Sequence, residues 1–361
     1  MKLISLFSGC GGLDLGFEKA GFEVIWANEF DPTIWDTFSL NFPKATLDKR
    51  SITKILSSEM PCADGIVGGP PCQSWSEAGA RMGIKDKRGQ LFYEYIRIIK
   101  NKEPLFFLAE NVPGMLLPRH SDAFHKILQK FRSLNYNVEY ALLNANDYNV
   151  PQDRKRVIFI GYHKDTGLSF RVPSEAPYRP TLKDAIWDLR GNAKPAKAFN
   201  KTNGSNLAIP NHEYMTGGFS TIYMSRNRVR NWDEPSFTIQ AGGRHAPIHP
   251  QAPKMKFIRE DKRIFAPGKE KLYRRLSVRE CARIQTFPDD FIFKYDSIAD
   301  GYKMVGNAVP VEFARHLAMA IRNDLKDYLK PYRKVAVPYG QVFKKETERN
   351  YVANSLHAHQ A

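Results

Sequence analysis

The first 165 residues alternate short apolar, β-rich runs with amphipathic stretches, and this alternation constrains the fold more than any other feature of the chain. Strands that alternate with helices are typical of a doubly wound sheet. The sequence therefore predicts an α/β protein with a Rossmann-like sheet. The expected strands are 2–7, 23–28, 64–68, 105–109, 138–143 and 157–161, and the expected helices include 91–100 and 122–134.

The pattern breaks near residue 172, where prolines become frequent and periodicity is lost. A smaller, irregular, β-rich domain of turns and short strands is expected there. Periodicity returns at 277–287 and again at 311–329, a long amphipathic helix that could pack back on the first domain. We expect one domain at 1–172, a second at 173–300, a return to the first at 301–330 and a polar tail at 331–361.

The chain carries a strong positive charge. Its 361 residues include 54 Lys and Arg against 38 Asp and Glu, which gives a formal net charge of +16. Clustered cations attract nucleic acid by releasing condensed counterions, so we expect a polyanionic partner. Half of the surplus falls in 201–280, which holds 15 basic and 7 acidic residues. This segment is where the polyanion is expected to bind.

Apolar runs and cysteines argue against several other classes of protein. No apolar run approaches the roughly 20 residues that a membrane span needs. Cys10, Cys62, Cys72 and Cys281 are scattered without a CxxC pair, which argues against a disulfide framework and against a structural zinc site. We therefore expect no membrane attachment, no metal and a reducing cytoplasm.

A glycine-rich turn follows the first expected strand. Glycines at Gly9 and Gly11 let a ligand approach the backbone, and the free N–H groups at the start of the following helix face it. Glu29 ends the second expected strand, where it can accept hydrogen bonds from a ribose. These features indicate an adenosine-type cofactor. A tight turn of any α/β protein is the alternative, and Asp14 stands where a dinucleotide-binding turn has its third glycine.

Cys72 follows the third expected strand, within the run Gly69–Gln73. This loop would lie at the carboxyl edge of the sheet, where open α/β folds bind ligands. Two prolines restrict the loop, and a thiolate is a strong nucleophile when nearby positive charge lowers its pKa. The alternative is a small buried hydrophobic residue.

A carboxylate and two guanidinium groups are expected at the same edge of the sheet. Glu110 follows the apolar strand 105–109, and Arg154 and Arg156 precede another strand. Taken singly, each is more often a solvated or ion-paired residue. A thiol, a carboxylate and two cations beside an adenosine site indicate a catalytic centre.

These residues resemble the cytosine-5 DNA methyltransferases that use S-adenosylmethionine. The resemblance extends to about residue 330, and its motifs occur in the order typical of that family. They are the Phe7–Gly11 turn, Glu29, Pro71–Gln73, Glu110–Val112, Gln152–Arg156, Arg275–Arg283 with Gln285–Pro288, and Gly301–Pro310. The segments 211–214, 225–230 and 237–241 are similar to the bacterial modification enzymes that recognise GGCC.

The resemblance implies a covalent mechanism. The Cys72 thiolate would add to carbon 6 of a flipped-out cytosine, and carbon 5 would then take the methyl group. Glu110 would bind ring nitrogen 3 and the exocyclic amine. Arg154 and Arg156 would hold the carbonyl oxygen of the base and nearby backbone, with Arg156 supporting Glu110. The inner cytosine of GGCC is the expected target, and the stretch 76–89 is expected to close over it.

The resemblance also implies where the cofactor binds. S-adenosylmethionine would lie against Phe7, Gly9, Gly11, Gly12, Leu13, Glu29, Phe30, Ser51, Ile52, Pro70, Leu91, Asn307 and Val309. One position departs from the family, because relatives usually have Asp-Ile where this chain has Ser51-Ile52. A serine hydroxyl can accept a bond from the adenine amine but carries no charge. Either cofactor affinity is lower, or Asp48 substitutes.

Double-stranded DNA is the implied partner of the 173–300 domain, which would recognise the target. The expected contacts are Ser76, Arg81, Arg88, Arg226, Arg228, Arg230 and Arg244. Arginine forks match the two acceptors of guanine at roughly 1–3 kcal/mol per pair, although each arginine could instead contact phosphate. A monomer in the bacterial cytoplasm is expected, belonging to a restriction-modification system in which a restriction endonuclease can share the target site.

Three other functions share some of these features. The transfer-RNA branch of the same family keeps the catalytic motifs, but no sign of its target segment is present. A catalytically silent DNA-binding relative should have lost Cys72 or Glu110, and both are present. A nicotinamide-dependent oxidoreductase is suggested by the glycine turn alone, and Asp14 together with the Pro-Cys-Gln run argues against it.

Overall fold

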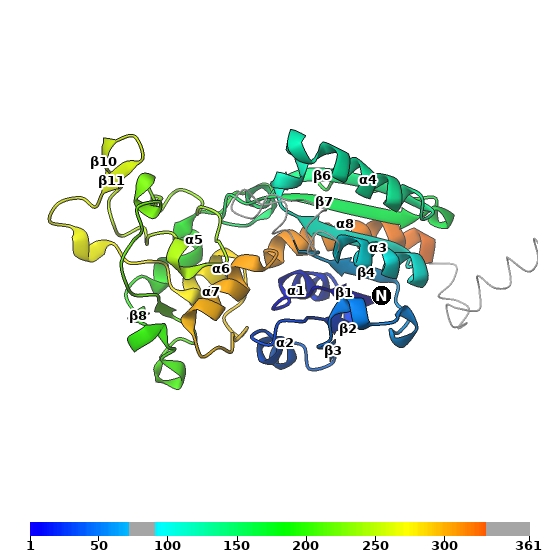
Figure 1. Cartoon of the computed structure of the whole chain (residues 1–361), viewed down its shortest axis with the longest axis horizontal. Coiled ribbons are helices and arrows are strands. Elements are labelled where there is room, and N and C mark those ends of the chain that lie inside the picture. Colours follow the sequence, from blue (N-terminus) through cyan, green and yellow to red (C-terminus); the bar gives the residue numbers. More distant parts are fainter. Residues whose placement is uncertain (72–90, 330–361) are drawn as a thin grey trace, which may run out of the picture. The chain divides into compact units, whose positions relative to one another are not determined.

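The computed structural model describes residues 1–71 and 91–329, and a seven-stranded sheet dominates this part of the chain (Figure 1). The strands are β1 (Lys2–Leu6), β2 (Glu23–Asn28), β3 (Thr46–Asp48), β4 (Gly65–Gly68), β5 (Phe106–Asn111), β6 (Tyr136–Asn144) and β7 (Lys155–His163). Their order is β3-β2-β1-β4-β5-β7-β6. The pairs from β3 to β5 are parallel, whereas β7 runs antiparallel to both β5 and β6. The predicted α/β, Rossmann-like fold is confirmed.

Helices cover both faces of the sheet. The helices are α1 (Gly12–Lys19), α2 (Trp35–Asn41), α3 (Leu91–Lys102), α4 (Ser121–Arg132), α5 (Leu182–Ile186), α6 (Val278–Ile284), α7 (Ile298–Asn307) and α8 (Val311–Leu329). Successive side chains of a strand point to opposite faces, so Phe106 and Phe107 of β5 meet different helices. Phe106 stacks on Phe17 of α1, with ring centroids 6.4 Å apart. Phe107 stacks on Phe131 of α4 at 4.6 Å. The sheet is thus wound on both sides, as expected.

Residues 173–300 contain short strands and many turns. Their strands are β8 (Lys194–Pro195), β9 (Glu213–Tyr214), β10 (Lys256–Arg259) and β11 (Lys262–Ile264), which form two small sheets. Buried side chains from this part, such as Ile284, join Phe38 of α2 and Cys10 in one hydrophobic cluster. Because one core crosses from the first part to the second, Met1–Ala320 form one compact unit.

The start of α8 packs on α1, as the sequence predicts for the helix 311–329. A Cβ atom placed on Gly16 would lie 2.4 Å from the Cβ of Ala314 and 2.6 Å from the carbonyl oxygen of Val311. Such contacts leave no room for any side chain at Gly16. The two helices therefore pack closely at Gly16.

The position of β1 decides where a ligand can bind. It pairs with β2 on one side and with β4 on the other. The chain therefore continues from β1 toward one edge of the sheet and from β4 toward the opposite edge. Open α/β sheets bind ligands at the crevice that such a reversal opens at the carboxyl ends of the strands. The glycine-rich turn follows β1 and the Pro70–Pro71 segment follows β4. Both candidate motifs therefore lie at this edge.

Candidate active site

The turn after β1 is built from residues with left-handed backbone. Phe7, Gly9 and Gly11 have φ of 54°, 56° and 92°. This region costs a residue with a side chain roughly 1–2 kcal/mol, and such residues gather at ligand sites. At Gly11 space is a second constraint, because a Cβ would lie 2.1 Å from the ring of Phe42. The backbone therefore turns sharply into α1, which begins at Gly12.

Glu29 is fixed directly against this turn. Its carboxylate accepts hydrogen bonds from the backbone N–H groups of Gly9 and Asp31, at 2.9 and 2.8 Å. Burial raises the pKa of Glu29, and these bonds only partly offset that effect. The next residue, Phe30, has a side chain that is 67% exposed. A fixed carboxylate beside an exposed ring suits the ribose and base of an adenosine group.

The other residues predicted to hold the cofactor differ in exposure. Gly12, Leu13, Ile52, Pro70 and Val309 are buried, Ser51 and Leu91 are half-buried, and Asn307 is exposed. A Cβ on Gly12 would lie 2.4 Å from the carbonyl oxygen of Val309. The glycine turn and the 301–310 segment therefore touch each other.

Asp48, the proposed substitute for the missing acid, is already paired. Both of its carboxylate oxygens bind the guanidinium of Arg50, the shorter contact being 2.6 Å. These bonds lower the pKa of Asp48 despite its partial burial. The hydroxyl of Ser51 instead contacts that of Thr53 at 2.9 Å.

Glu110 and Arg156 form a close ion pair at the neighbouring strand ends. Arg156 Nε lies 2.6 Å from Glu110 Oε1. A Cβ on Gly69 would lie 3.5 Å from Glu110 Oε2, and Asn111 donates from its side-chain amide to the carbonyl oxygen of Pro70 at 3.1 Å. The segment that leads to Cys72 is therefore attached to the strand that carries Glu110. Cys72, Ser76, Arg81, Arg88 and the expected closing loop lie outside the described residues.

Arg154 lies deep in the protein and binds backbone. Its guanidinium donates to the carbonyl oxygens of Ile239, Gly306 and Ala308, each at 3.0 Å, and the residue is 1% exposed. These contacts join the start of β7 to two distant segments. Such a placement favours a role in holding the site together over direct contact with a base.

Gln152, the first residue of the same motif, is also buried and also joins distant segments. Its side chain is fully buried, donates to the amide oxygen of Gln285 at 2.7 Å and accepts from the backbone N–H of Ile239 at 2.8 Å. Within the QxRxR pattern, Gln152 and Arg154 are therefore buried, whereas Arg156 pairs with the Glu110 carboxylate.

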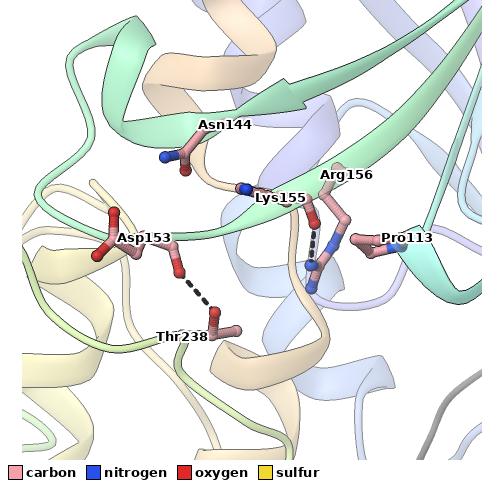
Figure 2. A pocket seen from close by; sticks show the side chains of 6 residues that line it. All are labelled: Pro113, Asn144, Asp153, Lys155, Arg156 and Thr238. Carbon is pink, nitrogen blue, oxygen red and sulfur yellow. Dashed lines mark hydrogen bonds between the residues drawn. The ribbon is translucent and has the colours of Figure 1, made fainter.

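A cleft of about 660 Å³ opens beside Arg156. Figure 2 shows the residues that line it, which are Pro113, Asn144, Asp153, Lys155, Arg156 and Thr238. Thr238 donates to the carbonyl oxygen of Asp153 at 2.5 Å, so the 236–240 segment forms one wall and the start of β7 another. Asp153, Lys155 and Thr238 lie in segments that carry the family resemblance, but the sequence assigns no role to them or to Asn144, because their spacing does not show that these segments meet.

Four of the six candidate DNA-binding arginines lie in the described residues, and they fall into two groups. Arg228 donates to the carbonyl oxygens of Tyr223 and Ile222, at 2.9 and 3.2 Å, and Arg230 pairs with Asp153 and Glu234. The side chains of Arg226 and Arg244 are exposed. Exposed cations are the better placed to meet a polyanion.

The described residues contain neither a metal-binding cluster nor a helix suited to cross a membrane. Within 1–71 and 91–329, no group of three or more His, Cys, Asp or Glu side chains is arranged to hold a metal ion. Among the helices in the same ranges, none has the length and apolar character that crossing a membrane requires.

Known proteins resemble the chain over almost its whole length. Residues 1–323 match the family described as C-5 cytosine-specific DNA methylase. The type II methyltransferase M.FnuDI of Fusobacterium nucleatum is 58% identical over 91% of this chain and 96% of its own. The type II methyltransferase M.MthTI of Methanothermobacter thermautotrophicus is 56% identical over 91% and 99%. A solved E. coli structure, described as a prophage-encoded DNA modification methyltransferase, superposes with a TM-score of 0.69 at 26% identity, covering 90% of this chain and 99% of that one.

Proposed function

The chain belongs to the C-5 cytosine-specific DNA methylases, and on that premise we propose that it methylates the inner cytosine of GGCC in duplex DNA. It is a cytosine-5 DNA methyltransferase of the type II modification class. The proposed methylation site is supported most directly by the Glu110–Arg156 pair, which borders the Pro70 segment and an open cleft. The likeness of 211–214, 225–230 and 237–241 to GGCC-recognising enzymes supports the sequence specificity.

Cys72 is the proposed nucleophile. It follows Pro71 directly, and the preceding Gly69 lies against the Glu110 carboxylate, which supports a thiol close to that group. Addition of the thiolate to carbon 6 places negative charge on the ring, and Glu110, protonated or sharing a proton, would donate to ring nitrogen 3 and stabilise that charge. After methyl transfer, loss of the carbon 5 proton and expulsion of the Cys72 thiolate would release 5-methylcytosine. Arg156 would hold Glu110 in position. The target base must leave the duplex to reach the thiol, at a cost of a few kcal/mol in stacking.

S-adenosylmethionine is the proposed cofactor, and the residues at the glycine turn fit it. The Glu29 carboxylate can accept from ribose hydroxyls, the exposed Phe30 ring can stack on adenine, and no side chain caps the start of α1 after the bend at Gly11. Bound there, the cofactor supplies the methyl group that carbon 5 takes up. With Asp48 tied to Arg50, Ser51 is the proposed partner of the adenine amine.

Residues 173–300 are the proposed target-recognition domain, beside a catalytic part at 1–172 and 301–330. Its exposed cations Arg226 and Arg244 would contact DNA, while Arg228 and Arg230 would shape the loop that carries them. We further propose a monomer that acts in the bacterial cytoplasm, with a restriction endonuclease that cleaves the same site.

Bisulfite sequencing of plasmid from cells that express the chain tests the proposal. Methylation confined to the inner cytosine of GGCC is expected, and a Cys72→Ser variant should leave the plasmid unmethylated. Methylated cytosines in another sequence context would reject GGCC. Incubation of the purified protein with duplex DNA and with transfer RNA separates the two branches of the family, since only the DNA should be labelled.

A further inference from the structure

Helix α7 contacts both chain segments that flank the proposed cofactor site. Lys303 forms an ion pair with the carboxylate of Asp31, two residues after Glu29. The next residue, Met304, accepts a hydrogen bond at its carbonyl oxygen from the thiol of Cys10, which lies in the glycine turn, at 3.4 Å. Two consecutive residues of one helix therefore reach the two halves of the site.

Asp31 is connected directly to Glu29. The backbone N–H of Asp31 donates to Glu29 Oε1 at 2.8 Å, so the position of Asp31 sets where that oxygen lies. The Asp31 carboxylate in turn accepts from the backbone N–H and the hydroxyl of Thr33, at 3.1 and 2.7 Å. Burial alone would raise the pKa of Asp31, but the bonds from Lys303 and Thr33 outweigh it and hold the pKa below its usual range.

A further hydrogen bond links the two ends of the loop 29–35. Trp35 donates from its indole N–H to the carbonyl oxygen of Glu29 at 2.8 Å. Lys303 also lies 3.5 Å from the hydroxyl of Thr33. The loop 29–35 is thus organised internally, and Lys303 ties it to α7, which begins at Ile298.

We infer that Lys303 is a positioning residue for Glu29, which it keeps in the orientation that receives the ribose of the cofactor. The inference rests on the proposed function, because it assigns a role within the proposed cofactor site. Lys303 touches no reacting atom in this scheme. Its effect reaches the cofactor through Asp31 and the backbone, so it should change cofactor affinity and leave the chemical step intact.

The test is the affinity of the whole protein for S-adenosylhomocysteine, measured by calorimetry without DNA. Lys303→Met should raise the Kd about threefold to tenfold, as expected for a half-buried ion pair that preorganises a ligand contact. Lys303→Arg should recover most of the affinity. Lys294→Met removes the same charge from an exposed position and should leave the Kd unchanged.

Steady-state kinetics provide the second readout. In Lys303→Met the KM for S-adenosylmethionine should rise by the same factor, with kcat at saturating cofactor within twofold of the wild type. Asp31→Asn should weaken binding similarly, and the double variant should be no weaker than either single one. An unchanged Kd in Lys303→Met, or additive losses in the double variant, would overturn the inference while leaving the proposed function standing. A wild-type chain that binds no S-adenosylhomocysteine would overturn the cofactor proposal and this inference together.

Discussion

The guanidinium of Arg156 lies 2.6 Å from the carboxylate of Glu110, and the two side chains are only 11% and 12% exposed. Removing one partner of a nearly buried pair leaves the other charge without compensation. Arginine also holds a carboxylate in a fixed plane, which the single ammonium of lysine does not. The pair therefore controls the orientation of the group proposed to bind the target base.

Replacing Arg156 tests this relationship. Arg156→Ala should lower the methylation rate about 100-fold or more, the scale of a lost acid-base or charge-stabilising contact, while Arg156→Lys should retain an intermediate rate. The rate of methyl transfer to a GGCC duplex is the measurement. Arg179→Ala is the control, because Arg179 is 56% exposed and pairs with Asp147 and Glu175 at the surface. Arg156→Ala with at least half the wild-type rate would contradict the prediction.

Gly16 should not tolerate a side chain. Gly16→Ala would place a Cβ within 2.4 Å of Ala314 and 2.6 Å of the Val311 carbonyl, so α1 and α8 would have to separate. Overpacking of this kind costs typically 1–3 kcal/mol of unfolding free energy. Urea denaturation measures the loss, and Gly191→Ala, where no atom lies within 4 Å of the added carbon, should change stability little. Equal stability of the two variants would show that the helices adjust freely.

Asp14 predicts a pH dependence of stability. Burial raises its pKa to about 7, and the Ser5 hydroxyl offsets this only partly. The unfolded carboxyl titrates near its ordinary pKa of about 3.9. Between these two values the folded chain binds a proton that the unfolded chain lacks. The stability contributed by Asp14 should therefore fall as pH rises from about 4 to about 7, by up to about 1.4 kcal/mol per pH unit.

Asp14→Asn removes this dependence. The variant should gain unfolding free energy relative to the wild type as pH rises through the same window, with a constant difference above about pH 7. Urea unfolding of both proteins at pH 5, 6, 7 and 8 gives the comparison, in which groups common to the two proteins cancel. Parallel stability curves would mean that Asp14 titrates alike in the folded and unfolded chains.

The arginines proposed to act in DNA binding should differ in how their replacement changes the salt dependence of binding. Arg226→Ala removes an exposed cation and should reduce the slope of log Kd against log salt by about one if it meets a phosphate. Arg228→Ala should lower methylation of all sequences equally and leave that slope unchanged, because its guanidinium binds the Tyr223 and Ile222 carbonyls. Loss confined to substrates with one particular base would instead make Arg228 a reader of that base.

Sequence patterns predicted the elements with strong local signals. Six of the sheet strands, and α3 and α4, match expected segments, because apolar periodicity is a local property. β3 was not predicted, since three residues are too few to show a period. The pattern also placed Glu110 and Arg156 at one edge of the sheet, because both adjoin apolar strands.

Contacts between distant segments could not be predicted in this way. Gln152 meets Gln285 and Lys303 meets Asp31 across 133 and 272 positions, and no local pattern records such a meeting. Arg154 and Arg156 look equivalent in the sequence. Only the packed structure shows that Arg154 points inward to backbone carbonyls while Arg156 reaches Glu110.

The buried guanidinium of Arg154 has a consequence for synthesis of the chain. It requires carbonyl groups of Ile239, Gly306 and Ala308, and the glycine turn likewise requires Val309 beside Gly12. A growing chain releases the glycine turn first and these partners more than 200 residues later. A nascent chain emerging from the ribosome therefore cannot complete its catalytic edge until nearly all of it has been translated. Interrupted translation products should be inert toward the genome of the cell.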